Sequence, residues 1–158
     1  MINELATFFI AALPLSELRG AIPLGILKFG FGSYKAFAIS VAGNILPVLP
    51  LLFGLEKTSE YLSRRFYWFN RFFNWLFERT RIKHSGRFAY WGDLALFIFV
   101  AIPLPLTGAY SGAVAAFVFG IPKARAFWSI VLGILTAGLI VTAATIFGEN
   151  IFSSIFNF

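Results

Sequence analysis

The chain has 158 residues, of which 59% are hydrophobic and only 13% are charged. Soluble domains carry about 25% charged residues, and a domain this small leaves much of its surface exposed, so lipid must be part of its solvent. The absence of cysteine excludes disulfides and thiol chemistry. With one histidine and seven carboxylates, we expect no metal and no cofactor.

The net charge of +6 could indicate nucleic-acid binding, but the distribution of the charge argues against it. Eight of the thirteen basic residues lie between Lys57 and Arg87, next to long apolar runs. A basic segment in this position is typical of a membrane surface that faces anionic lipid. We therefore expect membrane lipids as partners and no nucleic acid.

Four apolar blocks divide the chain, and they occupy residues 5–27, 35–55, 94–121 and 124–147. A helix needs about 20 apolar residues to cross the hydrocarbon core of a bilayer. The second and fourth blocks meet this requirement and are predicted to be transmembrane helices. Pro47 and Pro50 are expected to kink the second block.

The first and third blocks are interrupted near their middle. Residues 5–13 form an apolar run of about 14 Å as a helix, which reaches only the centre of the bilayer. Residues 14–23 contain two prolines and cannot be regular helix throughout. The third block repeats this arrangement, with an apolar run at 94–102 followed by the proline-rich stretch 103–108. Because broken backbone at membrane depth is tolerated only within protein or against a cavity, we predict two re-entrant hairpins, with kinked full crossings as the alternative.

The two halves of the chain also share sequence. A shift of 88 residues pairs Leu18 with Leu106 and Gly20 with Gly108, and it gives nine identities in the 21 positions from 18 to 38. Each half would cross the membrane once, so two halves joined by a linker that does not cross must be inverted relative to each other. Inverted repeats with broken helices are typical of transporters.

The predicted fold is an all-α integral membrane domain spanning residues 1–158. It consists of two inverted repeats, each a re-entrant helical hairpin plus a transmembrane helix, joined by an interfacial amphipathic helix. Its parts are repeat 1 at 5–55, a basic linker at 56–92, repeat 2 at 93–147 and a short tail at 148–158. The linker combines helical periodicity with an aromatic face, which is typical of a helix lying in the membrane interface.

The basic residues also predict the orientation of the chain. The rule that positive loops face the cytoplasm places the linker inside and both termini outside the inner membrane of a prokaryotic cell. Two crossings and two hairpins are few for a complete alternating-access machine, so we expect a homodimer.

Glu17 and Arg19 are the strongest functional candidates, because charged side chains near the membrane midplane normally face a cavity or each other. In the functional interpretation Arg19 binds an anionic group while Glu17 carries a proton or balances the charge. The alternative is a structural ion pair that holds the hairpin open. Asp93 precedes the third block, where we favour an N-cap over a second proton-coupling carboxylate at the mouth of a cavity.

The second hairpin tip carries no charge but offers hydroxyls, small residues and a helix start that could bind an anion. The alternative is that its small residues only permit tight packing. Asn44 lies mid-helix, and we expect it to hydrogen-bond across helices rather than line the path. The predicted substrate-binding residues are Ser16, Glu17, Arg19, Gly20, Pro103, Pro105, Thr107, Gly108, Tyr110 and Ser111. No catalytic motif is present, and we expect that the protein is not an enzyme.

The segment 14–23, PLSELRGAIP, resembles the small multidrug export protein family of prokaryotes, and the likeness extends to 101–112, AIPLPLTGAYSG. The family is similar in layout to the DedA/VTT superfamily, in which paired re-entrant hairpins are associated with moving lipid carriers such as polyprenyl phosphates. The resemblance implies that Glu17 matches an acidic residue of the first hairpin. DedA proteins typically place arginines around the second tip, whereas the stretch 103–112 has none.

These observations predict a transporter or flippase for an amphiphilic, anionic, lipid-phosphate-like substrate. Its head group would bind at Arg19 and the hairpin tips, and Glu17 would couple transport to protons. One alternative is a small exporter of lipophilic cations that uses Glu17 as a counter-ion. Another is a non-transporting scaffold whose basic linker recognises lipids or a partner protein.

Overall fold

A computed structural model describes residues 1–65, 71, 86–104 and 107–156 of the protein. Every regular element in these ranges is a helix, which confirms the predicted all-α class. The elements are α1 (Ile2–Ala12), α2 (Glu17–Pro23), the π-helical turn η1 (Leu24–Lys28), α3 (Ser33–Ile45), α4 (Val48–Arg65), α6 (Gly86–Ala101), α7 (Ala109–Val118) and α8 (Lys123–Phe156).

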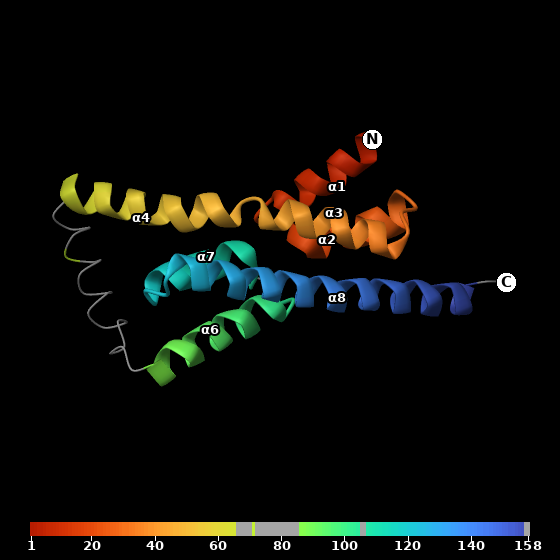
Figure 1. Cartoon of the computed structure of the whole chain (residues 1–158). Coiled ribbons are helices and arrows are strands. Elements are labelled where there is room, and N and C mark those ends of the chain that lie inside the picture. Colours follow the sequence, from red (N-terminus) through yellow and green to blue (C-terminus); the bar gives the residue numbers. More distant parts are fainter. Residues whose placement is uncertain (66–70, 72–85, 105–106, 157–158) are drawn as a thin grey trace.

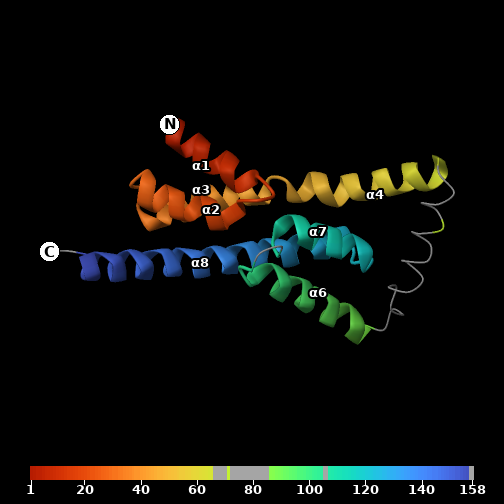
Figure 2. The same cartoon turned by 180° about the vertical axis from the view of Figure 1, so that it is seen from behind.

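Two long helical rods form the frame of the molecule. One is α3 followed by α4, and the other is α8, which runs beside it in the opposite direction (Figures 1 and 2). The segments Ser33–Thr58 and Lys123–Ile151 are long and apolar enough to cross a membrane. The predicted break at Pro47 is present between α3 and α4. Pro50 lies in the first turn of α4, where its missing N–H is not needed.

Two helical hairpins fill the space around the rods. The first consists of α1 and α2 with η1, and the second of α6 and α7; both turns lie about halfway along the rods (Figure 1). The first hairpin opens toward the end of the molecule that carries the C-terminus, and the second opens toward the other end. Each hairpin packs on the opposite half of the chain, because α2 contacts α8 and α7 contacts α4.

The break in the first hairpin is shorter than the sequence suggested. Only residues 13–16 leave the helix, whereas Glu17–Pro23 is α-helical and continues into Leu24–Lys28. Pro23 has no N–H to donate to the carbonyl four residues before it. The chain accommodates this loss with a wider turn, in which the Phe29 N–H bonds to the Leu24 carbonyl.

Helices extend beyond the apolar blocks at three places. Asp93 is not an N-cap, because α6 already begins at Gly86. Residues 56–65 of the predicted linker continue α4 instead of beginning a separate interfacial helix, and most of the remaining linker, 66–70 and 72–85, lies outside the described residues. The predicted tail is helical, since α8 extends to Phe156. Helices whose ends carry no strong stop signal extend beyond their apolar cores.

Matching structural features of the two halves are spaced by 90 residues rather than 88. Gly30 and Gly120 both have φ of 66°, and the next rod begins three residues after each of them. Ala36 and Ala126 are both fully buried. The shift of 88 residues rests on sequence identity alone. In apolar sequences several alignments of the two halves give many identities.

Glycine sets the distance between each rod and the adjacent hairpin. A Cβ on Gly43 of α3 would collide with the carbonyl oxygen of Phe8 in α1. A Cβ on Gly133 of α8 would lie 2.7 Å from the Cβ of Val100 in α6. Small residues at such crossings allow the backbones to approach closely, as is common in membrane helix pairs.

We predict that Gly43→Ala lowers the melting temperature of the purified protein in detergent. The added methyl group forces α1 and α3 apart, and overpacking of this kind costs about 1–3 kcal/mol. Gly54→Ala is the matched control, because a Cβ on Gly54 meets nothing within 4 Å and alanine favours a helix by up to about 1 kcal/mol. Equal melting temperatures for the two variants would contradict the close packing of α1 on α3.

Candidate functional site

The site lies where the tips of the two hairpins meet, and Glu17 is at its centre. Glu17 begins α2, and its side chain is buried, with 8% of the residue exposed. The backbone N–H groups of Tyr110 and Ala109 are hydrogen-bond donors to its carboxylate. Glu17 of the first hairpin therefore caps the N-terminus of α7 in the second, where a negative charge is favoured.

The backbone of Glu17 is strained by this placement. Its φ of 45° lies in the left-handed region that non-glycine residues avoid. Such conformations cost about 1–3 kcal/mol and persist where the surrounding structure enforces them, often at functional sites. The turn at 13–16 thus holds the carboxylate in a position that a regular helix start would not give.

Arg19 makes the second connection between the tips. Its guanidinium donates to the main-chain carbonyl of Thr107, and the same nitrogen lies 3.1 Å from the Thr107 hydroxyl. Among the described residues, no ion pair joins Arg19 to Glu17. Each of the two charged groups bonds to the second hairpin, although the Arg19 charge lies near enough to attract the Glu17 carboxylate.

Tyr110 makes the third connection, in the opposite direction. Its hydroxyl donates to the carbonyl of Ala12 over 2.5 Å. Ala12 is the last residue of α1, so this carbonyl has no partner within its own helix. Each tip thus provides side chains that bond to the free backbone groups of the other.

The remaining hydroxyls of the predicted site bond within their own hairpins. Ser16 donates to the Ile10 carbonyl over 2.6 Å, and the Ser111 hydroxyl lies 3.4 Å from the Gly108 carbonyl. The Thr107 hydroxyl shapes the second tip, with 2.6 Å to the Ile102 carbonyl and 3.1 Å to the Leu104 N–H.

The other predicted residues shape the tips. Gly20 packs against Ser16, since a Cβ there would lie 2.9 Å from the Ser16 Cβ. Pro103 lies half-buried in the second turn, and Pro105 lies outside the described residues.

Glycine is required at position 108 because the carboxylate of Glu17 lies very close to the backbone there. A Cβ at this position would overlap the carboxylate of Glu17. Any larger residue would push Glu17 away from the start of α7. Gly108 therefore belongs to the site because of its missing side chain.

A small cavity of about 10 Å³ lies between the tips and the rods, which is room for roughly one water molecule. Of the predicted residues, Glu17, Arg19 and Gly108 line it. The sequence analysis singled out Asn44 but favoured a hydrogen bond across helices over a place on the path, whereas Asn44 lines this cavity and its Oδ1 has no partner among the described residues. The complete lining is Glu17, Leu18, Arg19, Asn44, Val100, Gly108, Ala109, Ile134 and Ala137.

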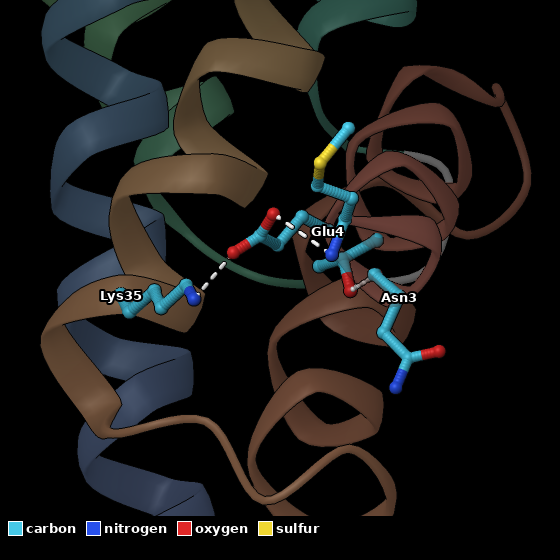
Figure 3. Close-up of polar contacts among 5 residues, drawn as sticks. Asn3, Glu4 and Lys35 are labelled. Carbon is cyan, nitrogen blue, oxygen red and sulfur yellow. Dashed lines mark hydrogen bonds and ion pairs between the residues drawn. The ribbon is translucent and has the colours of Figure 1, made fainter.

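Asp93 lies apart from this centre, about two helical turns before the end of α6. Its carboxylate forms an ion pair of 2.7 Å with Arg125 in the first turn of α8. At the other end of the molecule, Glu4 of α1 pairs with Lys35 in the first turn of α3 over 2.5 Å (Figure 3). Both ion pairs join the first arm of a hairpin to the start of the rod that follows it.

A sequence profile of the family described as "Putative small multi-drug export protein" matches residues 17–140. The chain belongs to this family. The match begins at Glu17 and includes the second tip, the whole of α3 and α4 and about half of α8, which confirms the resemblance to the small multidrug export family. Comparison with curated proteins finds no match, and comparison with solved structures finds none either.

We predict that Tyr110→Phe lowers the melting temperature, because it removes one bond between the tips and leaves the Ala12 carbonyl unsatisfied. A lost bond of this kind costs about 0.5–1.5 kcal/mol. Tyr34→Phe, at a position that is 84% exposed, is the matched control and should melt like the wild type. A melting temperature unchanged in both variants would show that the Tyr110 bond does not hold the tips together.

Proposed function

We propose that the protein is a membrane exporter or flippase for an amphiphilic anionic substrate, and that the head group binds where the hairpin tips meet. The family description and the two helices able to cross a membrane support transport. The observation that carries the proposal is that Arg19 and Glu17 each bond to backbone groups of the other hairpin rather than to one another. A ligand can replace such bonds.

An anionic head group is a better partner for Arg19 than its present one. The guanidinium now bonds to the neutral carbonyl and hydroxyl of Thr107, whereas bonds to phosphate or carboxylate are roughly twice as strong and are often bidentate. A phosphate that takes over Arg19 would release Thr107 and so loosen the contact between the tips. Binding of the substrate and opening of the contact between the tips would then occur together.

Glu17 supplies the coupling to protons in this mechanism. As a carboxylate it occupies the N–H groups at the start of α7, which is a site that also suits a phosphate. Protonation removes its negative charge, weakens its hold on these N–H groups and frees them for the substrate. Proton uptake and anion binding would therefore favour each other.

In this proposal the two hairpins are re-entrant and the two halves are inverted repeats, as in other transporters with broken helices. The opposite openings of the hairpins support this arrangement. The Glu4–Lys35 and Asp93–Arg125 pairs then close the two ends of the path. Both pairs are partly exposed, and ion pairs exposed to solvent contribute little to stability, so either can open at low cost.

The cellular setting of the proposal is the inner membrane of a prokaryotic cell, with the basic ends of α4 and α6 inside, both termini outside and two copies acting as a homodimer. The likeness to the DedA/VTT superfamily stays a prediction.

Export of lipophilic cations is the second candidate, because the family description names multi-drug export. It requires Glu17 as the counter-ion of the drug. The carboxylate already has donors from Tyr110 and Ala109, with Arg19 nearby, which makes the site a poor one for a cation. The scaffold hypothesis depends on the basic linker, most of which lies outside the described residues.

We predict that phosphatidylglycerol and a polyprenyl phosphate raise the melting temperature of the wild type and that Arg19→Ala abolishes this stabilisation. The reason is the loss of the guanidinium of Arg19, which is the only one among the described residues that line the cavity. Lys28→Ala, which removes an exposed basic residue of η1, is the control and should respond like the wild type. Stabilisation by lipophilic cations alone, undiminished in Arg19→Ala, would establish the second candidate instead.

We also predict that the wild type binds phosphatidylglycerol more tightly as the pH falls, whereas Glu17→Gln binds it with the same affinity across the range. Protonation of Glu17 frees the start of α7, and glutamine is neutral at every pH. A phosphodiester keeps one charge throughout, so the lipid itself does not titrate. Glu149→Gln at the exposed end of α8 is the control and should keep the pH dependence of the wild type. Identical pH profiles for Glu17→Gln and wild type would rule out Glu17 as the coupling group.

A further inference from the structure

Helix α3 carries two buried oxygen atoms for which the described residues provide no hydrogen-bond partner, Ser40 Oγ and Asn44 Oδ1. Ser40 is 0% exposed and Asn44 is 1% exposed. The two residues are four positions apart and therefore lie on the same face of the helix. Leaving a buried polar atom unsatisfied is unfavourable, so this face requires a ligand that can hydrogen-bond.

Asn44 lines the same cavity as Glu17 and Arg19. These three side chains are the polar ones around a space for roughly one water molecule, and a buried water typically has two to four polar partners. Water both donates and accepts hydrogen bonds. It therefore satisfies the amide of Asn44 whichever way its oxygen and nitrogen are oriented.

The groups around Glu17 leave few routes for a proton. From α2 it faces Arg19, whose guanidinium does not deprotonate in proteins. From α7 it faces Tyr110, whose hydroxyl proton is engaged with the Ala12 carbonyl. The cavity residues from α6 and α8 are apolar. Among the described residues that line the cavity, Asn44 of α3 has the remaining polar side chain.

We propose that Asn44 binds a water molecule against the carboxylate of Glu17, and that this water begins a proton route along α3 through Ser40. Ser40 lies one turn nearer the end of α3 where Lys35 pairs with Glu4. The proposed ligand is a water molecule, and its function is to carry the proton. Asn44 is a positioning residue, since it acts through the water and does not itself take the proton. The inference rests on the proposed function, in which Glu17 takes up and releases a proton.

The test is infrared difference spectroscopy of the full chain in lipid, without any substrate. The carbonyl band of protonated Glu17 is the band that Glu17→Gln removes, and its exchange from hydrogen to deuterium is followed after a change to D2O. In Asn44→Leu, which fills the cavity with an apolar group of similar size, we expect the exchange to slow about tenfold and the band to shift, because one hydrogen-bonded step is lost. Ser40→Ala should slow the exchange without shifting the band.

Two further variants serve as a second test and as a control. Asn44→Ser retains a hydroxyl and leaves more room for water, so it should exchange at least as fast as the wild type, and it substitutes for Asn44→Leu if that variant does not fold. Thr136→Ala removes a hydroxyl that bonds within α8 to Leu132 and should have no effect. Unchanged exchange and an unchanged band in Asn44→Leu, or slow exchange in Asn44→Ser, would overturn the water route.

The same spectra separate this inference from the function on which it rests. A Glu17 band that titrates in the wild type, together with unchanged exchange in Asn44→Leu and Ser40→Ala, overturns the route through α3 while Glu17 keeps its coupling role. The absence of any titrating band that Glu17→Gln removes overturns both proposals.

Discussion

Breaking a helix inside an apolar bundle leaves backbone N–H and C=O groups without partners, and the architecture of this protein depends on how those groups are satisfied. The carbonyl of Ala12, at the end of α1, accepts from Tyr110. The N–H groups at the start of α7 meet the carboxylate of Glu17, and the carbonyl of Thr107 accepts from Arg19. Each tip is completed by side chains of the other, so neither hairpin would be satisfied alone in an apolar environment.

This mutual completion explains why the charged residues lie where they do. Glu17 and Arg19 are separated by one residue, yet their bonds go to different groups of the second hairpin. The polar groups that join the two tips can form hydrogen bonds to a ligand instead. An apolar contact of the same size could not be exchanged in this way. In the proposed mechanism, the contact that joins the two tips is therefore also the contact at which the substrate acts.

Packing of the rods is a separate and less adaptable part of the structure. Gly43 and Gly133 bring a rod against the first arm of each hairpin, where an added methyl group has no room. The ion pairs Glu4–Lys35 and Asp93–Arg125 join the same elements near their outer ends and are partly exposed. The rods therefore pack on the hairpins through close backbone contacts, whereas the tips and the outer ends are joined by polar contacts.

Part of the candidate site could be predicted from the sequence because its signals are local, whereas the rest depends on contacts between distant residues. The break near Pro14, the charged pair Glu17 and Arg19, and Gly108 were found from the sequence, because prolines, glycines and charges in apolar runs are conspicuous one residue at a time. The helical state of Glu17–Pro23 was missed, since a wider turn lets the chain continue past Pro23. The register of 90 was missed because apolar sequence allows several alignments of similar quality.

The sequence by itself determined the class of the protein, its four apolar blocks, its two breaks and its family. These properties depend on composition and on local spacing, which a single chain displays directly. Only the tertiary structure decided that Arg19 reaches Thr107, that Asp93 pairs with Arg125 and that Asn44 faces the cavity of Glu17. Such contacts join residues far apart in the chain. They depend on the rotation of each helix about its axis, which a helix with apolar residues on every side does not reveal.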